Sequence, residues 1–510
     1  MSDTAYPSVN DLTLEEKASL TSGGDAWHLQ GVESKGIPGY MITDGPHGLR
    51  KSLASSTGET DLNDSVPATC FPPAAGLSSS WNPELIHKVG EAMAEECIQE
   101  KVAVILGPGV NIKRNPLGGR CFEYWSEDPY LAGHEAVGIV AGVQSKGVGT
   151  SLKHFAANNQ ETDRLRVSAN ISQRALREIY FPAFEHIVKT AQPWTIMCSY
   201  NRINGVHSAQ NRWLLTDVLR DEWGYEGIVM SDWGADHDRV ASLNAGLNLE
   251  MPPSYTDDQI VYAARDGRIQ PEQLDRMAQG MVDLVNKTRA AMSVENYRFD
   301  VDAHDEVAHQ AAVESMVLLK NDGNILPVAA NAKIAVIGEF ARTPRYQGGG
   351  SSHITPTKMT SFLDTLAARG VDVAFAPGFT LDLEPADRTL EAEAVETAKN
   401  ADVVLMFLGL PEAAESEGFD RETLDIPAKQ VELLKAVAAE NKNIVVVLSN
   451  GSVVSVAPWA GNAKGILESW LLGQAGGPAL ADVIFGKVSP SGKLAQTIPM
   501  NINDDPSMIN

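Results

Sequence analysis

A carboxylate and an indole stand side by side in residues 227–235, at the end of a short apolar run. Parallel α/β folds place their chemistry at the carboxyl ends of such strands, so Asp232 is the first candidate for a catalytic group. An aspartate in this position also caps helices, and Trp233 then only packs against its neighbours. Asp232 by itself therefore leaves a catalytic and a structural interpretation open.

Charged side chains follow other apolar runs in the same part of the chain. Lys153 and His154 are adjacent at the end of one run, and Asp44 precedes a sharp Gly-Pro turn. Arg120 and Arg164 lie in polar loops. Each of them alone is explained by a surface ion pair. Together on one rim, they predict a site that binds vicinal hydroxyl groups through charge-assisted hydrogen bonds.

A second carboxylate candidate lies in the acidic loop 415–421, after the apolar run 402–407. Acidic loops are usually solvated surface. Gly418, however, places Glu417 on flexible backbone that could swing over a neighbouring pocket. Glycoside hydrolysis needs two carboxylates, one that attacks the anomeric carbon and one that protonates the leaving oxygen.

The elements that must position these groups fall into two α/β parts, as expected for 510 residues. Runs typical of strands lie at 39–44, 102–107, 149–154, 194–200, 227–232 and 246–251, with helical periodicity at 83–100, 174–190 and 271–288. This alternation predicts a TIM-like barrel, either complete or incomplete, over 1–292. A linker at 293–312 follows it, because that stretch begins without a long apolar run.

The second part, residues 313–500, is predicted to be an open doubly wound α/β sandwich domain followed by a polar tail at 501–510. Its near-continuous apolar runs are typical of strands covered on both faces. They lie at 333–338, 371–375, 402–407, 443–448 and 465–470, with helices expected at 429–441 and 477–485.

Composition excludes several classes of function. The 41 basic against 66 acidic residues, a net charge of −25, argue against nucleic acid or anionic membranes and favour a small neutral substrate. Four cysteines without a CxxC pair, no leader-like N-terminus and no run of about 18 apolar residues predict a cytoplasmic protein, with a homo-oligomer left open. We expect no metal and no cofactor, since HExxH, GxGxxG and P-loop motifs are missing and the glycines of 348–352 suit a flexible loop.

Taken together, the motifs resemble glycoside hydrolase family 3, the β-glucosidase-like enzymes with a barrel domain and an α/β sandwich domain. The matching segments are DGPHGLR (44–50), NPLGGRCFEYWSEDP (115–129), KHF (153–155), SYNRING (199–205), SDWG (231–234), EGFDR (417–421) and SGK (491–493). The resemblance implies that Asp232 is the nucleophile and Glu417 the general acid/base. It implies substrate-binding roles for Asp44, Arg50, Arg120, Lys153, His154, Arg164, Tyr200, Trp233 and Ser351.

Two departures from the family pattern refine this expectation. Residues 156–164 contain no histidine, whereas N-acetylglucosaminidases of the family carry one there as acid/base, so the proton donor is expected to be Glu417. The chain also stops soon after residue 493, so we expect the fibronectin-III-like domain of related enzymes to be absent from it.

The predicted function is therefore a retaining exo-acting β-glycosidase. We expect a β-glucosidase acting on small β-glucosides or oligosaccharides, with a β-xylosidase or another β-glycosidase of the family as the nearest alternative. From other classes, a non-catalytic sugar-binding protein and a nucleotide-dependent oxidoreductase are the alternatives. The oxidoreductase lacks the expected cofactor fingerprints.

Overall fold

The computed structural model describes residues 8–53, 64–329 and 331–508. The N-terminal residues 1–7, in which no leader pattern was found, and the last two residues of the predicted tail lie outside the described residues. The chain divides into two compact units. The first unit comprises residues 1–51, 83–112 and 129–299, and the second comprises 52–82, 113–128 and 300–510.

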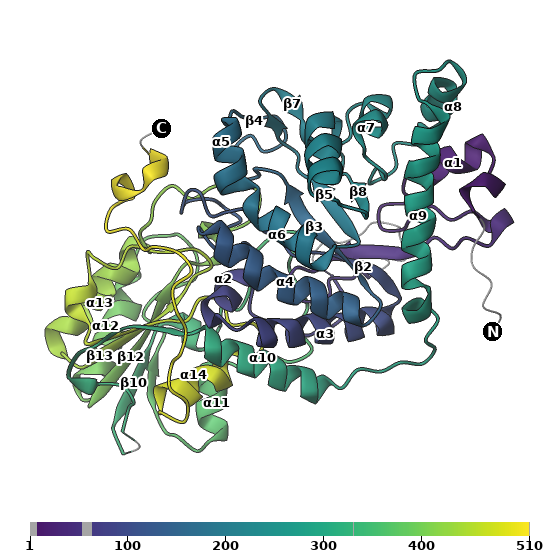
Figure 1. Ribbon diagram of the computed structural model, residues 1–510. Coiled ribbons are helices and arrows are strands. Elements are labelled where there is room, and N and C mark those ends of the chain that lie inside the picture. The colour runs from purple at the N-terminus through teal and green to yellow at the C-terminus, as the bar shows by residue number, and fades with distance from the viewer. Residues whose placement is uncertain (1–7, 54–63, 330, 509–510) are drawn as a thin grey trace. The chain divides into compact units, whose positions relative to one another are not determined.

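The first unit is built on a parallel sheet of five strands in the order β1-β2-β3-β5-β8 (Figure 1). Its strands are β1 (Met41–Asp44), β2 (Val102–Leu106), β3 (Gly149–Phe155), β5 (Thr195–Cys198) and β8 (Ile228–Met230), and β4 (Ser168–Ala169), β6 (Arg202–Ile203) and β7 (Val206–His207) form a small separate sheet. Five of the six strands predicted for this part are therefore present, and their carboxyl ends carry the predicted site residues.

Helices of the first unit cover this sheet. They are α1 (Leu14–Leu20), α3 (Pro83–Glu100), α4 (Pro129–Ser145), α5 (Gln173–Ala175), α6 (Pro182–Ala191), α7 (Arg239–Ala245), α8 (Asp257–Arg265) and α9 (Pro271–Met292). The helices α3 and α4 lie side by side next to β2 and β3, and α9 contacts β2 and β8 (Figure 1). Aromatic side chains of Phe155, Phe181, Phe184 and Trp223 pack together beneath the carboxyl end of β3 with ring centroids 5.2 to 5.9 Å apart.

The sixth predicted strand, 246–251, forms only single bridges, from Leu249 to β8 and from Glu250 to Ser22. The side chain of Asn248 accepts the N–H of Val229, and two prolines that cannot donate to a ladder follow Met251. Further single bridges join Gly23 to Leu29, and His28 to Met41 of β1. The parallel α/β architecture is confirmed, whereas the barrel stays a prediction because strands in the described residues occupy only five of eight positions.

The helix predicted at 174–190 is broken. After α5 the chain makes a π-helical segment, Leu176–Tyr180, and α6 then starts at Pro182. Proline has no N–H for the preceding turn, so it is tolerated at a helix start and interrupts a helix elsewhere. A second π-helical segment, Trp213–Glu222, was not predicted.

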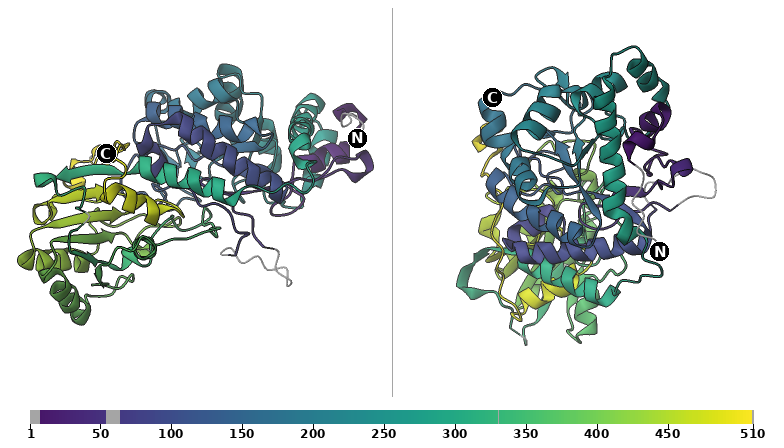
Figure 2. Two further views of the ribbon diagram at one scale, coloured as in Figure 1. Left: turned by 90° about the horizontal axis from the view of Figure 1, so that it is seen from below. Right: turned by 45° about the vertical axis from the view of Figure 1, so that its right-hand side comes forward.

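The second unit contains a six-stranded sheet in the order β11-β10-β12-β13-β14-β9, in which only β9 is antiparallel to its neighbour. The strands are β9 (Val317–Asn321), β10 (Ile334–Ile337), β11 (Ala374–Ala376), β12 (Val403–Gly409), β13 (Ile444–Ser449) and β14 (Gly465–Glu468). The helices are α2 (Ala74–Leu77), α10 (Val301–Ser315), α11 (Phe362–Ala368), α12 (Arg388–Lys399), α13 (Ala428–Glu440) and α14 (Gly476–Ile484). The helices α12 and α13 pack together, and α14 packs against α10 and α11, so helices flank the sheet (Figure 2).

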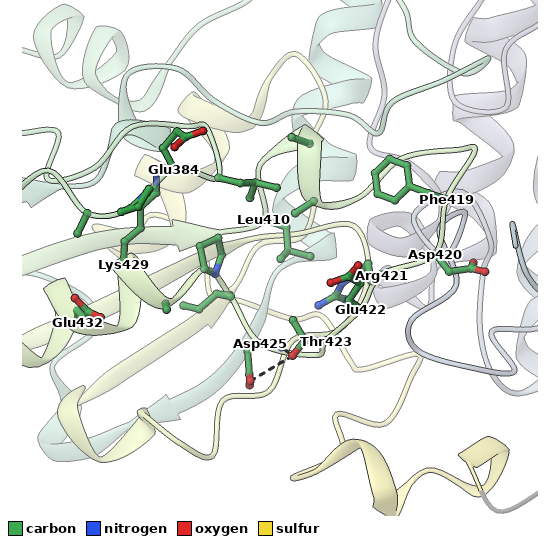
Figure 3. A pocket seen from close by; sticks show the side chains of 18 of the residues that line it. Glu384, Leu410, Phe419, Asp420, Arg421, Glu422, Thr423, Asp425, Lys429 and Glu432 are labelled. Atoms are coloured by element: carbon green, nitrogen blue, oxygen red, sulfur yellow. Dashed lines mark hydrogen bonds between the residues drawn. The ribbon is translucent and has the colours of Figure 1, made fainter.

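A pocket of about 1110 Å³ opens beside the carboxyl end of β12 (Figure 3). One wall consists of residues 383–388, which lead into α12, and the other follows β12 as far as the start of α13. The lining combines apolar groups, such as Leu410 and Phe419, with charged groups such as Glu384. Residues 419–423 belong to the loop that carries Glu417, so one side of that loop borders open space.

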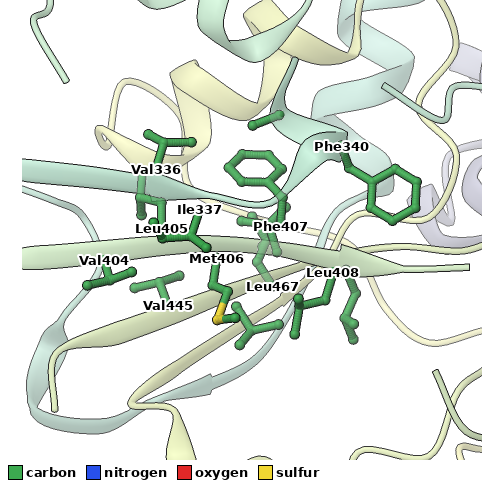
Figure 4. Close-up of a cluster of buried hydrophobic side chains, with 14 of the residues drawn as sticks. Val336, Ile337, Phe340, Val404, Leu405, Met406, Phe407, Leu408, Val445 and Leu467 are labelled. Carbon is green, nitrogen blue, oxygen red and sulfur yellow. The ribbon is translucent and has the colours of Figure 1, made fainter. Parts of the chain in front are cut away.

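The core of the second unit lies on both faces of the sheet. Side chains from β10, β12, β13 and β14 are buried with Phe340 and Phe407 in one cluster (Figure 4). Burial on both faces explains why these strands read as near-continuous apolar runs. All five strands predicted here are present, whereas the antiparallel edge strand β9 was not predicted.

The two units do not correspond to the two consecutive stretches of the chain that the sequence predicted. The predicted linker, 293–312, holds most of helix α10, whose N-cap Asp300 accepts hydrogen bonds from the N–H groups of residues 302 and 303. Ala308, Ala311 and Ala312 are buried, and the helix packs in the second unit. Residues 52–82 and 113–128, predicted as parts of the first domain, are grouped with the second unit by their contacts. None of the helices in the described parts is long and apolar enough to cross a membrane.

Candidate active site

Asp232 follows β8 and is held at the edge of the sheet by backbone contacts. The Oγ atom of Ser231 donates to the carbonyl of Met251 at 3.0 Å and accepts the N–H of Met251 at 2.8 Å. The N–H of Trp233 donates to Oδ1 of Asp232 at 2.7 Å. Asp232 is only 7% exposed, so its carboxylate is oriented and largely withdrawn from water.

Two neighbouring side chains of β3, an ammonium group and an imidazole, face two carboxylates. Nε2 of His154 lies 3.8 Å from Oδ2 of Asp232, and Nζ of Lys153 lies 3.7 Å from Oδ1 of Asp44. Arg50 also donates to Asp44, from Nη1 to Oδ2 at 3.3 Å. All five side chains are buried. The structure thus brings Asp44, Arg50 and the Lys153-His154 pair together with Asp232, as the sequence predicts for one rim.

Asn111 holds this rim in place and was not predicted to do so. Its side-chain amide donates to the carbonyl of His154 at 2.9 Å, and its carbonyl oxygen accepts the N–H of His154 at 2.9 Å. These paired bonds fix the backbone that presents Lys153 and His154. The available signal was weak, since Asn111 only stands in the polar loop after the apolar run 102–107.

Trp233 is anchored on two sides. Its indole Nε1–H donates to the carbonyl of Ala26 at 3.1 Å, and its ring lies 5.1 Å from that of Trp27 between centroids. The hydroxyl of Tyr200 donates to the carbonyl of Trp233 at 3.0 Å. Trp233 therefore forms a fixed aromatic surface next to Asp232, as predicted, whereas its partner Trp27 was missed.

Arg164 is connected to Trp233 through Tyr200. Its guanidinium carbon is 5.4 Å from the ring centroid of Tyr200, and its Nη1 donates to Oε2 of Glu161 at 2.9 Å. The predicted residues of the first unit thus form one continuous series from Arg50 through Asp232 to Arg164. Arg164 contacts Tyr200 and Glu161.

Burial shifts the pKa of two other titratable groups beside Asp232. It raises the pKa of the Cys198 thiol, and the negative charge of Asp232 adds to this effect. It also raises the pKa of Asp236, although hydrogen bonding from Ser242 opposes the shift.

Glu417 stands at the tip of a tight loop in the second unit. Single bridges join Ser416 to Phe419 across the turn and to Gly349 on the other side. Gly418 takes a φ of 104°, in the region that favours glycine. The Glu417 side chain is 13% exposed. The sequence predicts this loop to be flexible, yet its tip is attached to the neighbouring segment.

The Glu417 carboxylate has donors on both oxygens. The backbone N–H of Ser351 donates to Oε2 at 2.7 Å, and Nη1 of Arg120 lies 3.6 Å from Oε1. Arg120 also donates from Nε to Glu123. Both contacts with Glu417 stabilise its ionised form. Ser351 approaches through its backbone, whereas the prediction assigned it a contact with the substrate.

The rim position expected for Arg120, with Lys153 and His154, stays a prediction. The segment 113–128, which contains Arg120, is grouped with the second unit. The reason is backbone pairing, because the N–H of Gly119 donates to Asp420 at 3.0 Å and the N–H of Arg421 donates to Leu117 at 2.8 Å. In the second unit Arg120 is a partner of Glu417.

Gly350 explains how the glycine-rich segment approaches Glu417 so closely. A Cβ atom on Gly350 would lie 2.5 Å from Cβ of Glu417, and Gly350 has a φ of 101°. Two hydrogen bonds of 2.8 Å between the Gln347 side chain and the backbone of Ile354 hold the ends of this segment together. The segment predicted as a flexible loop is therefore a fitted cradle for the acid/base candidate.

No group of three or more His, Cys, Asp or Glu side chains in the described part of the chain could hold a metal ion. The chemistry available in the two units is that of carboxylates, a histidine, a lysine and guanidinium groups. Such a set can attack a carbon centre, transfer protons and bind hydroxyl groups.

Comparison with family models identifies the chain. Residues 51–284 match the glycosyl hydrolase family 3 N-terminal domain, and residues 316–510 match the glycosyl hydrolase family 3 C-terminal domain. The chain belongs to glycoside hydrolase family 3. The resemblance inferred from the motifs is thereby confirmed, and this family 3 chain is a glycoside hydrolase.

Relatives of this family 3 enzyme are named either as an arabinopyranosidase or as β-glucosidases. It is 87% identical to an exo-α-(1→6)-L-arabinopyranosidase of Bifidobacterium breve, over 100% of this chain and 69% of that protein. It is 50% identical to the thermostable β-glucosidase B of Acetivibrio thermocellus, over 98% of this chain and 67% of that one. The crystal structure of a family 3 β-glucosidase of Bifidobacterium adolescentis is 95% identical with a TM-score of 0.95, covering 99% of this chain and 73% of that one.

Proposed function

We propose that this family 3 enzyme is a retaining exo-acting β-glycosidase, and specifically a β-glucosidase that hydrolyses terminal β-D-glucosyl residues of small glucosides or oligosaccharides. The observation that carries the proposal is the buried carboxylate of Asp232, oriented by the Trp233 N–H and with His154 at 3.8 Å. A carboxylate oriented in this way at a strand end suits attack on an anomeric carbon.

In the first step Asp232 attacks the anomeric carbon and the bond to the leaving oxygen breaks. Glu417 donates a proton to that oxygen, and a covalent glycosyl-enzyme results. In the second step Glu417, now a carboxylate, removes a proton from water, which displaces Asp232 and releases the sugar with its original configuration. The Arg120 and Ser351 donors suit the ionised form of Glu417 that this second step requires.

The surrounding residues suit the tasks that the family resemblance implies for them. Lys153 and Arg50 contact Asp44, which suits this carboxylate as an acceptor for sugar hydroxyls, and Trp233 offers an aromatic surface next to Asp232. His154 favours the ionised form of Asp232 when its ring is protonated. The second unit contributes the proton donor.

A second candidate function is α-L-arabinopyranosidase, which the 87% identical relative favours. An α-L-arabinopyranoside has an equatorial leaving group like a β-D-glucoside, so the same displacement serves both sugars. It differs by an axial hydroxyl at C4 and by hydrogen in place of the hydroxymethyl group at C5. We propose that residues around Asp44, and not Asp232 itself, decide between the two sugars.

Covalent labelling tests the nucleophile. Incubation with 2-deoxy-2-fluoro-β-D-glucosyl fluoride is expected to leave one glycosyl group on Asp232, located by mass spectrometry of peptides. The fluorine at C2 slows both steps by destabilising their oxocarbenium-like transition states, but the fluoride leaving group keeps the first step fast, so the intermediate accumulates. Labelling at another residue, or none with the glucosyl, xylosyl and arabinosyl probes, rejects the mechanism.

A panel of aryl glycosides tests the sugar. We expect the highest kcat/KM with the β-D-glucopyranoside, compared at equal leaving group with the α-L-arabinopyranoside and the β-D-xylopyranoside. A higher value for the arabinoside selects the second candidate and leaves the roles of Asp232 and Glu417 untouched. A higher value for the xyloside selects the alternative considered from the sequence.

A leaving-group series tests the acid/base. Glu417→Ala is expected to lower kcat/KM by about 10²- to 10⁴-fold on a poor leaving group but much less on an activated aryl glucoside. Added azide is expected to restore turnover by attacking the glycosyl-enzyme without needing a base. Glu422→Ala, an exposed carboxylate in the same loop, is the control. Equal loss on both substrates for Glu417→Ala would assign the proton transfer to another group.

A further inference from the structure

A second glutamate of the Glu417 loop is fully buried. Glu415 is 0% exposed, although it stands only two residues before Glu417 at the loop tip. Nη1 of Arg345 donates to Oε2 of Glu415 at 2.8 Å, and the N–H of Gly451 donates to the same oxygen at 2.8 Å. The hydroxyl of Ser452 donates to Oε1. Such a saturated set of donors is unusual for a loop carboxylate, because loops normally keep charges in water.

The other end of the loop is attached to the same place. Nη1 of Arg421 donates to Oγ of Ser452 at 2.8 Å and to the carbonyl of Val453 at 2.8 Å. Arg421 itself is also buried. Glu415 and Arg421 therefore bracket Glu417, and both are tied to the residues that directly follow strand β13.

The network is charged rather than neutral. Burial opposes ionisation of Glu415, but the cations Arg345 and Arg421, with the hydrogen bonds from Ser452 and Gly451, lower its pKa. Arg345 also donates to the backbone of the loop, from Nη2 to the carbonyl of Glu415 at 3.0 Å and from Nη1 to that of Leu410 at 2.7 Å. Charge-assisted bonds of this kind are directional and hold a geometry more strictly than apolar contacts do.

One side of the loop borders a pocket. Residues 410, 413, 414 and 419–423 line it, so that side faces open space instead of core (Figure 3). Phe419, next to Gly418, is 40% exposed. The other side is attached to residues 117–119 and 349–351 by backbone hydrogen bonds, and to the residues after β13 by the buried ions.

We propose that Glu415, with Arg345, is a positioning residue for proton transfer, because it holds the loop so that Glu417 reaches the leaving oxygen and the incoming water. This inference rests on the role of Glu417 in the proposed function. Proton transfer needs the two heavy atoms within hydrogen-bond reach, and a displacement of about 1 Å costs roughly 100-fold in rate. Glu415 touches no substrate and acts only through Glu417.

The test is a set of variants measured on a poor and on an activated aryl glycoside. Glu415→Gln is expected to lower kcat/KM about 10- to 100-fold on the poor leaving group and less than about 5-fold on the activated one. A rate loss from impaired folding alone would be equal on both substrates. The matched control is Asp482→Asn, which removes a carboxylate that is also buried and paired with an arginine, Arg369, at 2.7 Å, but lies on α14. The control is expected to show no dependence on the leaving group.

Azide and a double variant separate positioning from folding. Azide needs no general base, so it is expected to raise turnover of Glu415→Gln on the activated substrate, as it does for Glu417→Ala. In Glu415→Gln/Glu417→Ala, the loss on the poor leaving group is expected to equal that of Glu417→Ala alone, because Glu415 has no other route to the reaction. Additive losses, or equal losses on both substrates without azide rescue, overturn the proposal.

A milder change covers the case in which Glu415→Gln does not fold. Ser452→Ala removes the hydroxyl that joins Glu415 to Arg421 and leaves both charges in place. It is expected to give the same selective loss at about 3- to 10-fold, and no selectivity would reject the network. If Glu417→Ala itself lacks both the leaving-group dependence and the azide rescue, the proposed function fails. If only the Glu415 and Ser452 variants lack them, the positioning role alone fails.

Discussion

The two candidate carboxylates are held by different kinds of structure. Asp232 follows strand β8, and its neighbours Lys153 and His154 stand in β3 of the same sheet, where the register between β3 and β5 shifts between Leu152 and Phe155. Two hydrogen bonds with the Asn111 side chain hold the backbone there. Glu417 stands on a loop that borders a pocket and is attached through buried ions. The groups around Asp232 are therefore placed by strand ends and backbone hydrogen bonds, whereas the loop of Glu417 also uses buried charged contacts.

The largest loss of activity is expected when the nucleophile candidate is exchanged for a neutral group. Asp232→Asn is expected to lower kcat on an aryl β-glucoside by about 10⁴- to 10⁶-fold, because an attacking group has no substitute within a preformed site. Initial rates measure the effect. Asp236→Asn, four residues along the same segment, is the control and is expected to stay within about 10-fold of the unchanged enzyme. Similar losses in both variants would mean that the segment matters for its fold and not for its carboxylate.

The second region is tested by moving Glu417 without changing its chemistry. Gly350→Ala places a Cβ atom against Glu417, and we expect a loss of roughly 100-fold on poor leaving groups with little change on activated ones. Gly370→Ala is the matched control, since Gly370 also has a positive φ, of 69°, but nothing within 4 Å of a new Cβ. If both variants show the same loss, backbone strain and not the displacement of Glu417 is responsible.

A smaller effect, on the pH dependence of stability, is expected from one buried glutamate in each unit. Burial raises the pKa of Glu468 in the second unit to about 8, and burial with the nearby charge of Glu84 raises that of Glu135 in the first unit to about 8. Unfolded glutamate titrates near 4.5. Between these two values the folded protein retains a proton that the unfolded chain has lost, so stability falls as pH rises from about 4.5 to 8 and levels off above it.

Replacing either glutamate by glutamine is expected to remove its contribution to this pH-dependent loss of stability. Between pH 6 and 7.5 one carboxyl group contributes about 2 kcal/mol to the loss, at roughly 1.4 kcal/mol per pH unit. Denaturant titrations of Glu468→Gln and Glu135→Gln at the two pH values measure it. A pH dependence unchanged from that of the parent protein would show that the group ionises in the folded state near its ordinary pKa.

Much of the fold could be predicted because its signals are local. The apolar runs that became β10, β12 and β13 are long enough to stand out, and α3 begins and ends where its periodicity does, at Pro83 and Glu100. The strand expected at 246–251 was wrong because a side chain of Asn248 and two prolines interrupt the ladder. The edge strand β9 was missed because only its first residue, Val317, is buried and it ends in the polar residues Lys320 and Asn321.

The candidate site likewise has features that the sequence predicted and features that it did not predict. The sequence by itself determined the family, through motifs in a fixed order, and it singled out Asp232, Glu417 and the charged residues that follow the apolar runs. Only the tertiary structure decided which side chains meet: Arg120 and the backbone of Ser351 hold Glu417, Asn111 fixes the backbone of His154, and Glu415 is a buried anchor. Residue types and periodicity depend on nearby positions in the chain, whereas these contacts join segments tens to hundreds of residues apart, and only packing determines which of them come together.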